Sequence, residues 1–209
     1  MRQIEIIYIN GKPGCGKDTQ ACEILKLFPN ISKRISTGDI YRGAKTPEGE
    51  YGQYYEQIKP HIDFVDNKGG LVPDDIIVPI VKQVILTENK KNNISEFIFT
   101  GFPRTVGQLE EVNKMTHQLN SQNYFINYQL SDKISQQRAK HRREKCLVSG
   151  ENIRNDDQPD VVLRRLKTFH QQTQPVLDKL KQENRLITID ASGTIEEIRL
   201  ETEKHFHPK

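Results

Sequence analysis

Apolar residues occur along this chain in short runs that are separated by longer amphipathic segments. The first run, Ile4–Ile9, is continuous and ends at a glycine-rich turn, which is typical of a buried strand. Four further apolar or β-branched segments follow at the spacing of a strand–helix repeat: Ser32–Ser36, Glu96–Thr100, Tyr124–Leu130 and Leu186–Ile189. Helical patterns cover Asp74–Thr87, Val106–Leu119, Asp132–Arg143, Pro159–Gln182 and Ile195–Phe206. This alternation predicts a three-layer α/β/α fold with a parallel five-stranded sheet.

Two stretches do not fit the repeat. Ala44–Val72 carries several aromatic residues without a clear strand, which predicts a small helical insertion. Glu144–Asn155 is polar and has Ser149-Gly150 at a turn. Both stretches have the character of mobile covers over a site. Asp74 and Asp132 stand at the starts of helical patterns, where N-caps are expected.

Length, charge and cysteine content narrow the class of protein. A chain of 209 residues buries one good core, so we expect a single domain. The formal net charge of +3 is too small to favour duplex nucleic acid as a partner but suits a polyphosphate ligand. Three cysteines without a CxxC pair predict neither a disulfide framework nor a metal pair. The first strand begins too early to leave room for a signal peptide, and no apolar stretch reaches the 18 residues of a membrane span, so we expect a cytoplasmic protein.

A glycine-rich turn, Gly11-Lys-Pro-Gly-Cys-Gly-Lys17, follows the first strand directly. We expect its backbone N–H groups all to point inward and form a cradle for phosphate oxygens, and a helix beginning near Gly16 would direct its positive end at the same anion. Lys17 would reach the outer phosphates, so the turn predicts a nucleoside triphosphate site. Asp18 occupies the place where the usual pattern has Ser or Thr. The alternative is a structural β-to-helix turn with a surface lysine, and Cys15 is either a reactive thiol or a small space-filling residue.

Two further segments follow strands. Ser36-Thr-Gly-Asp-Ile-Tyr-Arg42 comes after the second strand and Thr100-Gly-Phe-Pro-Arg-Thr105 after the third. The carboxyl ends of parallel strands line the ligand crevice of an open α/β sheet, so both segments should meet there. Arg104 is well placed for a phosphate and Gln108 for a base edge. Asp39 alone would be interpreted as a helix N-cap.

These segments, with Gly16-Lys-Asp-Thr-Gln20 and Arg154-Asn-Asp-Asp157, occur in the order and spacing of the adenylate kinase motifs GKGTQ, STGD-x-x-R, DGFPRT-x-x-Q and R-x-D-D. The chain therefore resembles the adenylate kinases from about residue 4 to its C-terminus. Each motif alone would be weak evidence, but the four together are highly specific.

The resemblance implies a P-loop kinase that transfers the γ-phosphoryl of MgATP to AMP, giving two ADP. For ATP binding it implies Gly14, Cys15, Gly16, Lys17, Asp18, Thr19, Arg138, Arg142 and the Gly193 carbonyl. For AMP binding it implies Thr37, Arg42, Gly70, Leu71, Val72, Gly101, Phe102, Pro103, Arg104, Gln108, Arg154 and Arg165. Phosphoryl transfer needs converging cations and no nucleophile, so the implied catalytic set is Lys17, Arg104, Arg138, Arg142, Arg154 and Arg165.

The resemblance also divides the single domain into a core (1–43, 73–142 and 155–209), a monophosphate-binding insertion (44–72) and a short lid (143–154). Only Cys146 lies in that lid, so no structural zinc is expected. We expect a monomer whose ligands are ATP, AMP and ADP, with no nucleic-acid or membrane partner. The alternative for the basic stretch around Arg138 and Arg142 is a solvated helix face or an RNA-binding patch.

The chain departs from the family at Thr100, which replaces the first aspartate of DGFPRT and so removes a carboxylate that orders the magnesium water shell. Asp18 replaces a glycine in the same region, and either Asp18 or Asp39 could supply the missing charge. Thr37 and Gln108 favour adenine over a pyrimidine base. A UMP/CMP kinase or another nucleoside monophosphate kinase, and a nucleotide-binding pseudokinase, are the alternatives that stay open.

Overall fold

The computed structural model describes residues 3–27, 31–150 and 157–205. One five-stranded sheet has the order β2-β3-β1-β4-β5, and each neighbouring pair is parallel. Its strands are β1 (Glu5–Gly11), β2 (Ser32–Ser36), β3 (Glu96–Thr100), β4 (Gln122–Gln129) and β5 (Leu186–Asp190). The predicted parallel sheet is confirmed, with β2 and β3 at the expected residues and the other strands shifted by one or two residues at an end.

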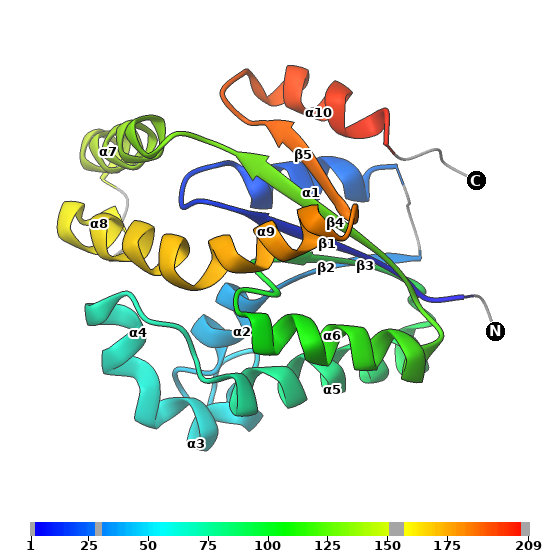
Figure 1. Cartoon of the computed structure of the whole chain (residues 1–209). Helices are drawn as coiled ribbons and strands as arrows, with labels where there is room; N and C mark the ends of the chain where they lie inside the picture. Colours follow the sequence, from blue (N-terminus) through cyan, green and yellow to red (C-terminus); the bar gives the residue numbers. More distant parts are fainter. Residues whose placement is uncertain (1–2, 28–30, 151–156, 206–209) are drawn as a thin grey trace.

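Helices cover both faces of the sheet, as Figure 1 shows. On one face lie α5 (Asp74–Asn92), α6 (Val106–Leu119) and α9 (Gln174–Gln182), and on the other α1 (Lys17–Leu25) and α10 (Ile195–Glu203). The first face is aromatic: the ring of Tyr8 stacks at 5.1 Å from Phe125 and 5.7 Å from Phe99. The second face is mainly aliphatic. Continuous apolar strands are buried on both faces in this way because helices pack on each side of a parallel sheet.

The carboxyl ends of β1, β2 and β3 lie level with one another. Thr100, the last residue of β3, is paired in register with Ile9 of β1 and Ser36 of β2. The chain leaves these ends into α1, into α2 (Thr37–Gly43) and into the loop before α6. The segments that carry the phosphate motifs therefore emerge side by side at one edge of the sheet, as an open α/β sheet requires.

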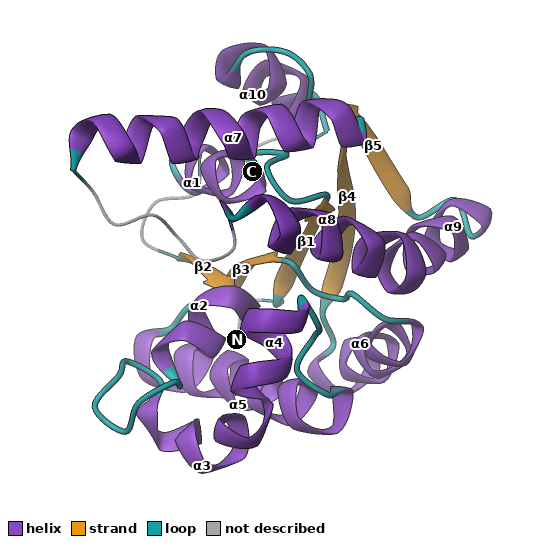
Figure 2. Cartoon of the chain, turned by 90° about the vertical axis from the view of Figure 1, so that its left-hand side faces the viewer, coloured by secondary structure: helices purple, strands orange, loops and turns teal. Residues whose placement is uncertain are grey.

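The predicted helical insertion between residues 44 and 72 is confirmed. It contains α3 (Tyr55–Ile58), α4 (Ile62–Lys68) and two 3₁₀ turns, and it lies beside α2 in Figure 2. The hydroxyl of Tyr41 on α2 donates to Asp66 of α4 at 2.9 Å, and Lys45 forms a 2.5 Å ion pair with the same carboxylate. The Thr168 hydroxyl donates to the Gly69 carbonyl at 2.9 Å, so the end of the insertion is tied to the helix that faces it.

Several helix boundaries differ from the predictions. Helix α7 runs from Asp132 to Ser149 and not to Arg143, because no residue breaks the helix before Gly150, which ends it in the left-handed region at φ 73°. The expected helix end at Arg143 is therefore wrong, because residues 144–149 continue the helix. The predicted helix Pro159–Gln182 is divided into α8 (Pro159–Thr168), a π-helical turn (Phe169–Thr173) and α9. Helix α5 extends past Thr87 to Asn92, and α10 ends at Glu203.

The expected N-caps at Asp74 and Asp132 are also wrong by one residue. Pro73 and Ser131 hold the N-cap positions, and each aspartate is the first residue inside its helix. The Ser131 side chain accepts a hydrogen bond from the backbone N–H of Ile134 at 3.3 Å. Both carboxylates still lie in the first turn, where they interact favourably with the positive end of the helix dipole.

The described part of the chain bears on three expectations, which concern disulfides, membrane-spanning helices and metal ligands. Cys15, Cys22 and Cys146 are unpaired. None of the described helices combines the length and the apolar character needed to cross a bilayer. Among the same residues, no three His, Cys, Asp or Glu side chains are grouped as metal ligands.

Candidate active site

The glycine-rich turn joins β1 to α1 and lies against α7. Gly16 is the N-cap of α1 with φ 86°, a conformation that glycine adopts without the steric cost that a Cβ would bring. The Ser135 hydroxyl of α7 donates to the Pro13 carbonyl at 2.5 Å, which fixes the outside of the turn. The Cys15 N–H donates to the Lys12 carbonyl at 3.1 Å. The expectation that all N–H groups of the turn point at a ligand is therefore wrong for Cys15.

The Cys15 side chain fills space beneath the turn. It has no exposed surface, and a Cβ at Gly11 would lie 2.6 Å from its sulfur. Burial raises the pKa of the Cys15 thiol. Of the two interpretations from the sequence, the geometry favours a space-filling residue over a reactive thiol, because a reactive thiol needs exposure and a lowered pKa.

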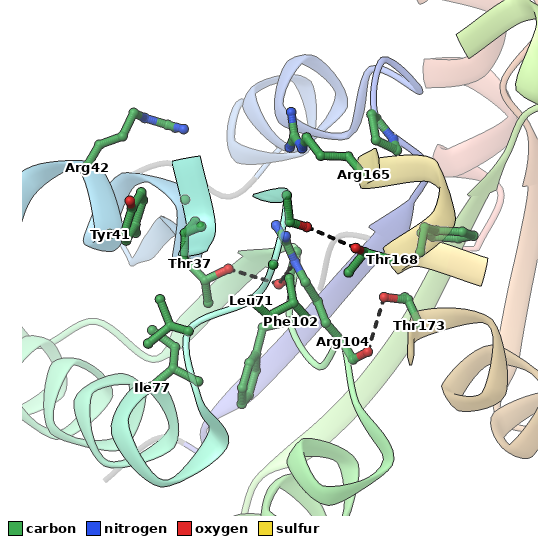
Figure 3. Close-up of a pocket in the computed structure, with 18 of the residues that line it drawn as sticks. Thr37, Tyr41, Arg42, Leu71, Ile77, Phe102, Arg104, Arg165, Thr168 and Thr173 are labelled. Atoms are coloured by element: carbon green, nitrogen blue, oxygen red, sulfur yellow. Dashed lines mark hydrogen bonds between the residues drawn. The ribbon is translucent and has the colours of Figure 1, made fainter. Parts of the chain in front are cut away.

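Basic side chains from four separate segments line one cavity of about 530 Å³ at the carboxyl edge of the sheet: Lys17, Arg42, Arg104 and Arg165. Figure 3 shows Arg42, Arg104 and Arg165 reaching into it from α2, from the loop after β3 and from α8. Of the other residues predicted for AMP binding, the lining includes Thr37, Gly70, Leu71, Val72, Gly101, Phe102 and Gln108. Pro103 is buried beside them. Arg154 lies outside the described residues.

Arg104 is held firmly at the centre of this cavity. Its Nε donates to the Gly101 carbonyl at 2.6 Å, and its own carbonyl accepts from the Thr173 hydroxyl at 3.1 Å. Desolvation by burial, reinforced by the nearby charge of Arg165, lowers the pKa of the Arg104 guanidinium to about 10. A guanidinium stays protonated at neutral pH, so the shift shows that Arg104 carries its charge in a buried place, with a smaller contribution from repulsion by the like charge of Arg165. An anion placed between these groups would relieve that repulsion.

Thr37 and Gln108 are both anchored by protein contacts. The Thr37 hydroxyl donates to the Gly101 carbonyl at 2.9 Å. The side-chain oxygen of Gln108 accepts from the backbone N–H of Arg104 at 2.7 Å, and its nitrogen donates to Asp74 at 2.8 Å. Because an amide has two N–H groups and two lone pairs, one donor and one acceptor of Gln108 stay available for a base. Asp39 is not the N-cap of α2: the Ser36 hydroxyl holds that position and accepts from the Asp39 N–H at 3.4 Å.

The residues predicted for the adenine side of ATP come together in a second place. Arg138 donates to the carbonyl oxygens of Gly14 at 3.4 Å and Gly193 at 3.3 Å. Arg138 and Arg142 line a shallow groove along α7 that is separate from the first cavity. Arg142 binds both carboxylate oxygens of the buried Asp157. Helix α7 packs on α8 through Ala139, Val162 and Leu166, which sets the position of both arginines.

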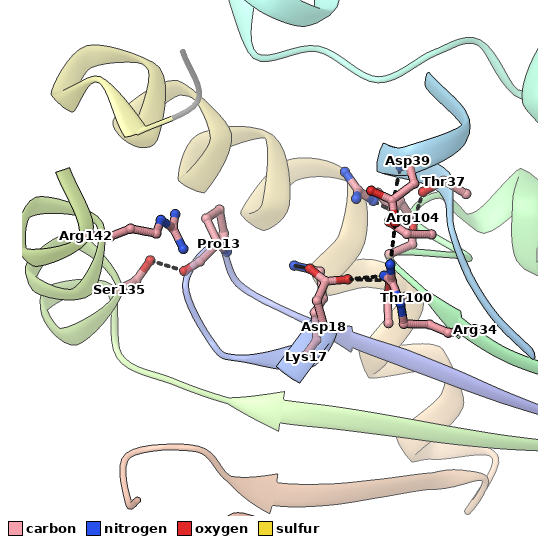
Figure 4. A network of polar contacts seen from close by, with 12 residues as sticks. Pro13, Lys17, Asp18, Arg34, Thr37, Asp39, Thr100, Arg104, Ser135 and Arg142 are labelled. Atoms are coloured by element: carbon pink, nitrogen blue, oxygen red, sulfur yellow. Dashed lines mark hydrogen bonds and ion pairs between the residues drawn. The ribbon is translucent and has the colours of Figure 1, made fainter. Parts of the chain in front are cut away.

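A polar network joins the glycine-rich turn to α2 through the end of β3 (Figure 4). The buried Thr100 hydroxyl donates to Asp18 at 2.7 Å, and Arg34 donates to Asp18 at 3.2 Å and to Asp39 at 2.6 Å. Arg42 completes the network with a 2.5 Å bond to Asp39. Thr19, next to Asp18 in the first turn of α1, is exposed.

Sequence reasoning missed Arg34 and Thr173. Arg34 lies in the polar strand pattern Ser-Lys-Arg-Ile-Ser, which indicates a solvated strand and gives no sign of its two carboxylate partners. Thr173 lies inside a long helical pattern, and its contact with the Arg104 carbonyl depends on the π-helical turn. A departure from the helical repeat at that turn would have indicated Thr173, but the periodicity of the sequence does not show it.

Comparison with known proteins gives a consistent result. A sequence model described as "Adenylate kinase" matches residues 9–185. The chain is 35% identical to the adenylate kinase of Parabacteroides distasonis, with 92% of each chain covered. It is 33% identical to the adenylate kinases of Staphylococcus aureus and Staphylococcus epidermidis, with 92% of this chain and 94% of those proteins covered. Since the family match includes the glycine-rich turn and nearly the whole chain is covered by these relatives, the chain belongs to the adenylate kinase family.

Proposed function

We propose that this protein catalyses the reversible transfer of the γ-phosphoryl group of MgATP to AMP, giving two molecules of ADP. The observation that carries the proposal is that Lys17, Arg42, Arg104 and Arg165, from four segments far apart in the sequence, line one cavity. Phosphoryl transfer between two nucleotides brings several negative charges together, and converging cations are what such a reaction requires. Membership of the adenylate kinase family supports the same reaction.

The glycine-rich turn and α7 form the ATP side in this proposal. The free N–H groups of the turn, the positive end of α1 and Lys17 bind the ATP phosphates. Arg138, close to the Gly193 carbonyl, packs on the adenine ring, while Arg142 lies one helical turn further along. The residues proposed for this side are Gly14, Cys15, Gly16, Lys17, Asp18, Thr19, Arg138, Arg142 and Gly193.

The cavity beneath α8 holds AMP. Arg42 and Arg104 bind its phosphate, and the backbone at Gly70–Val72 lies along the cavity wall. The remaining donor and acceptor of Gln108 match the N1 and N6 positions of adenine, which favours AMP over CMP and UMP. An amide that loses a matched partner costs about 1–3 kcal/mol, enough for tenfold discrimination or more.

Direct in-line transfer follows if the two nucleotides meet at Lys17 and Arg104, with Arg165 and Arg154 neutralising the transferred group. The insertion (44–72) and the short lid (143–154) act as covers that exclude water. Half-exposed Asp18 at the phosphate turn offers an oxygen ligand of the kind that a hydrated Mg²⁺ prefers, so the residues present fit the ion. When bound, Mg²⁺ would neutralise phosphate charge. We further propose a cytoplasmic monomer that needs no structural zinc.

A turnover screen tests the proposal. Purified protein is incubated with ATP and each of AMP, dAMP, CMP, UMP and GMP, with and without Mg²⁺, and ADP formation is followed by a coupled assay. We expect the highest kcat/KM with AMP and a strict requirement for Mg²⁺. A preference for a pyrimidine nucleotide would reassign the substrate, and tight ATP binding without turnover for any monophosphate would indicate a pseudokinase. A variant Lys17→Met should abolish turnover in either direction.

A further inference from the structure

Two carboxylates, Asp18 and Asp39, lie near the end of β3, where Thr100 brings no negative charge. Either could face the hydrated Mg²⁺ that accompanies ATP. The choice between them rests on the proposed function, because it concerns the metal that the proposed reaction needs. The contacts of each carboxylate separate the two.

Both carboxylate oxygens of Asp39 accept hydrogen bonds from arginine side chains of the protein. Its Oδ2 accepts from Arg34 at 2.6 Å and its Oδ1 accepts from Arg42 at 2.5 Å. Both oxygens therefore carry a charge-assisted bond to a guanidinium, which neutralises the carboxylate and fills its best acceptor directions. These contacts point to a structural role in holding Arg42.

Asp18 has a different arrangement. Its Oδ1 accepts from the Thr100 hydroxyl at 2.7 Å and from Arg34 at 3.2 Å, whereas its Oδ2 lies 4.0 Å from the Lys17 Nζ. The anchored oxygen therefore points at the end of β3, and the other oxygen points toward the lysine proposed for the ATP phosphates. The side chain is 56% exposed, so a hydrated ion can reach it. Thr100 itself is fully buried, which makes it a fixed anchor.

We propose that Asp18 is the carboxylate that holds the water shell of the ATP-bound Mg²⁺, and that Thr100 and Arg34 are positioning residues that orient it. Mg²⁺ keeps several of its waters and binds through one or two carboxylates together with substrate phosphates. Asp18, in the first turn of α1, supplies the negative charge. The hydroxyl of Thr100, at the end of β3, fixes the rotamer of Asp18. Desolvation opposes ionisation of Asp18, but the charge of Lys17 and the Thr100 hydrogen bond outweigh it, and the pKa of the carboxyl is below its usual value.

Metal affinity tests Asp18 without relying on turnover. Mn²⁺ is titrated into the complex of each protein with a non-hydrolysable ATP analogue, and free Mn²⁺ is measured by electron paramagnetic resonance. We expect Asp18→Asn, which keeps the size and hydrogen bonding of the side chain, to weaken Mn²⁺ binding about tenfold. Asp39→Asn should leave Mn²⁺ affinity unchanged. Glu23→Gln is the matched control: it removes one negative charge from the same helix, from a carboxylate that pairs with Lys26 at 2.6 Å.

Thr100 and Arg34 are tested by conservative pairs. Thr100→Val removes the hydroxyl from a buried site at nearly constant volume, and we expect it to weaken Mn²⁺ binding severalfold. Thr100→Ser keeps the donor and should retain the affinity of the unaltered protein. Arg34→Gln should weaken Mn²⁺ binding less than Asp18→Asn, because Arg34 acts only through the carboxylate. The exchanged variant Asp18→Gly with Thr100→Asp returns a carboxylate to the end of β3 and should restore Mn²⁺ affinity.

The outcomes separate this inference from the proposed function. Equal Mn²⁺ affinity of Asp18→Asn and the unaltered protein, with normal binding of the ATP analogue, overturns the role of Asp18 and leaves the proposed function standing. Loss of Mn²⁺ binding in Asp39→Asn with none in Asp18→Asn assigns the role to Asp39 and also overturns it. Failure of the unaltered protein to bind the analogue overturns both. Circular dichroism of each variant establishes that affinity is compared between folded proteins.

Discussion

The side-chain nitrogen of Gln108 donates to Oδ1 of Asp74 at 2.8 Å, which fixes the direction in which the Gln108 amide is presented to the cavity. The same aspartate accepts from the Thr105 hydroxyl at 2.6 Å. A free amide can rotate and offer either its oxygen or its nitrogen to a base. Asp74 removes that freedom together with the Arg104 N–H, from which the Gln108 oxygen accepts at 2.7 Å, so the specificity for a base depends in part on a residue that need not contact it.

Asp74→Ala should therefore reduce the discrimination between AMP and IMP, whose six-position is an acceptor where AMP has a donor. We expect the ratio of the two kcat/KM values to fall about tenfold, within the range of about 1–3 kcal/mol for one mismatched hydrogen bond. Steady-state kinetics with both nucleotides measures it. Asp75→Ala is the matched control, because Asp75 is the exposed neighbour of Asp74. An unchanged ratio in Asp74→Ala would show that the amide direction is set elsewhere.

Arg165 and Arg164 are adjacent on α8 but have different surroundings. Arg165 lines the cavity and its charge acts on Arg104, whereas Arg164 forms a 2.6 Å ion pair with Asp160. We expect Arg165→Ala to lower kcat by about a thousandfold, the effect of removing a cation that stabilises the transferred phosphoryl group. Arg164→Ala should change kcat less than twofold. Similar losses in the two variants would mean that Arg165 acts through the fold of α8 and not through its charge.

The architecture could be predicted from the sequence because its signals are local. Each strand is a short apolar or β-branched run, and the motifs lie directly after β1, β2 and β3, whose carboxyl ends a parallel sheet must bring together. The pairing of Ile9 and Ser36 with Thr100 then places the motifs side by side. Sequence reasoning also identified Asp18 and Thr100 as a joint departure from the family pattern, without reaching their direct hydrogen bond.

What sequence could not supply depends on tertiary distances. Arg34 joins Asp18 to Asp39 only because the first turns of α1 and α2 lie on either side of the end of β2. Local propensity does not resolve where α7 ends, because strong helix formers (Glu144, Lys145 and Leu147) alternate with weak ones and neither Pro nor Gly occurs before Gly150. The partners of Gln108 depend on the packing of α5 against α6, which no motif encodes.

Thr173 offers a test of how the π-helical turn positions Arg104. Its hydroxyl donates to the Arg104 carbonyl at 3.1 Å, and its side chain is buried. Thr173→Val leaves that carbonyl without its donor, so we expect a loss of about 1–3 kcal/mol in the free energy of unfolding and a severalfold higher KM for AMP. Urea denaturation and steady-state kinetics measure the two effects. Thr173→Ser loses a methyl group and about 1 kcal/mol of stability but should keep the original KM. A raised KM in both variants would contradict the role of the hydroxyl.

Asp132 links the glycine-rich turn to the π-helical turn and gives the protein a defined response to acid. It forms a 2.5 Å ion pair with Lys12 and lies 2.9 Å from His170 Nε2. The hydrogen bond to Lys12 is the main cause that holds the pKa of Asp132 below its usual value, while desolvation opposes it. A carboxyl with a lowered native pKa stabilises the fold at pH above its unfolded value of about 4, and this contribution is lost as the pH falls through the native pKa.

We therefore expect Asp132→Asn to lower the free energy of unfolding at pH 5 and above, and this difference from the unaltered protein to shrink toward zero below about pH 4. Urea denaturation across this range at low salt measures it, and added salt should reduce the difference because Asp132 is partly exposed. Lys12→Met removes the main partner and should give the same pH dependence. A difference that grows as the pH falls would mean that Asp132 is destabilised by its surroundings in the folded state, contrary to the direction argued from its ion pair.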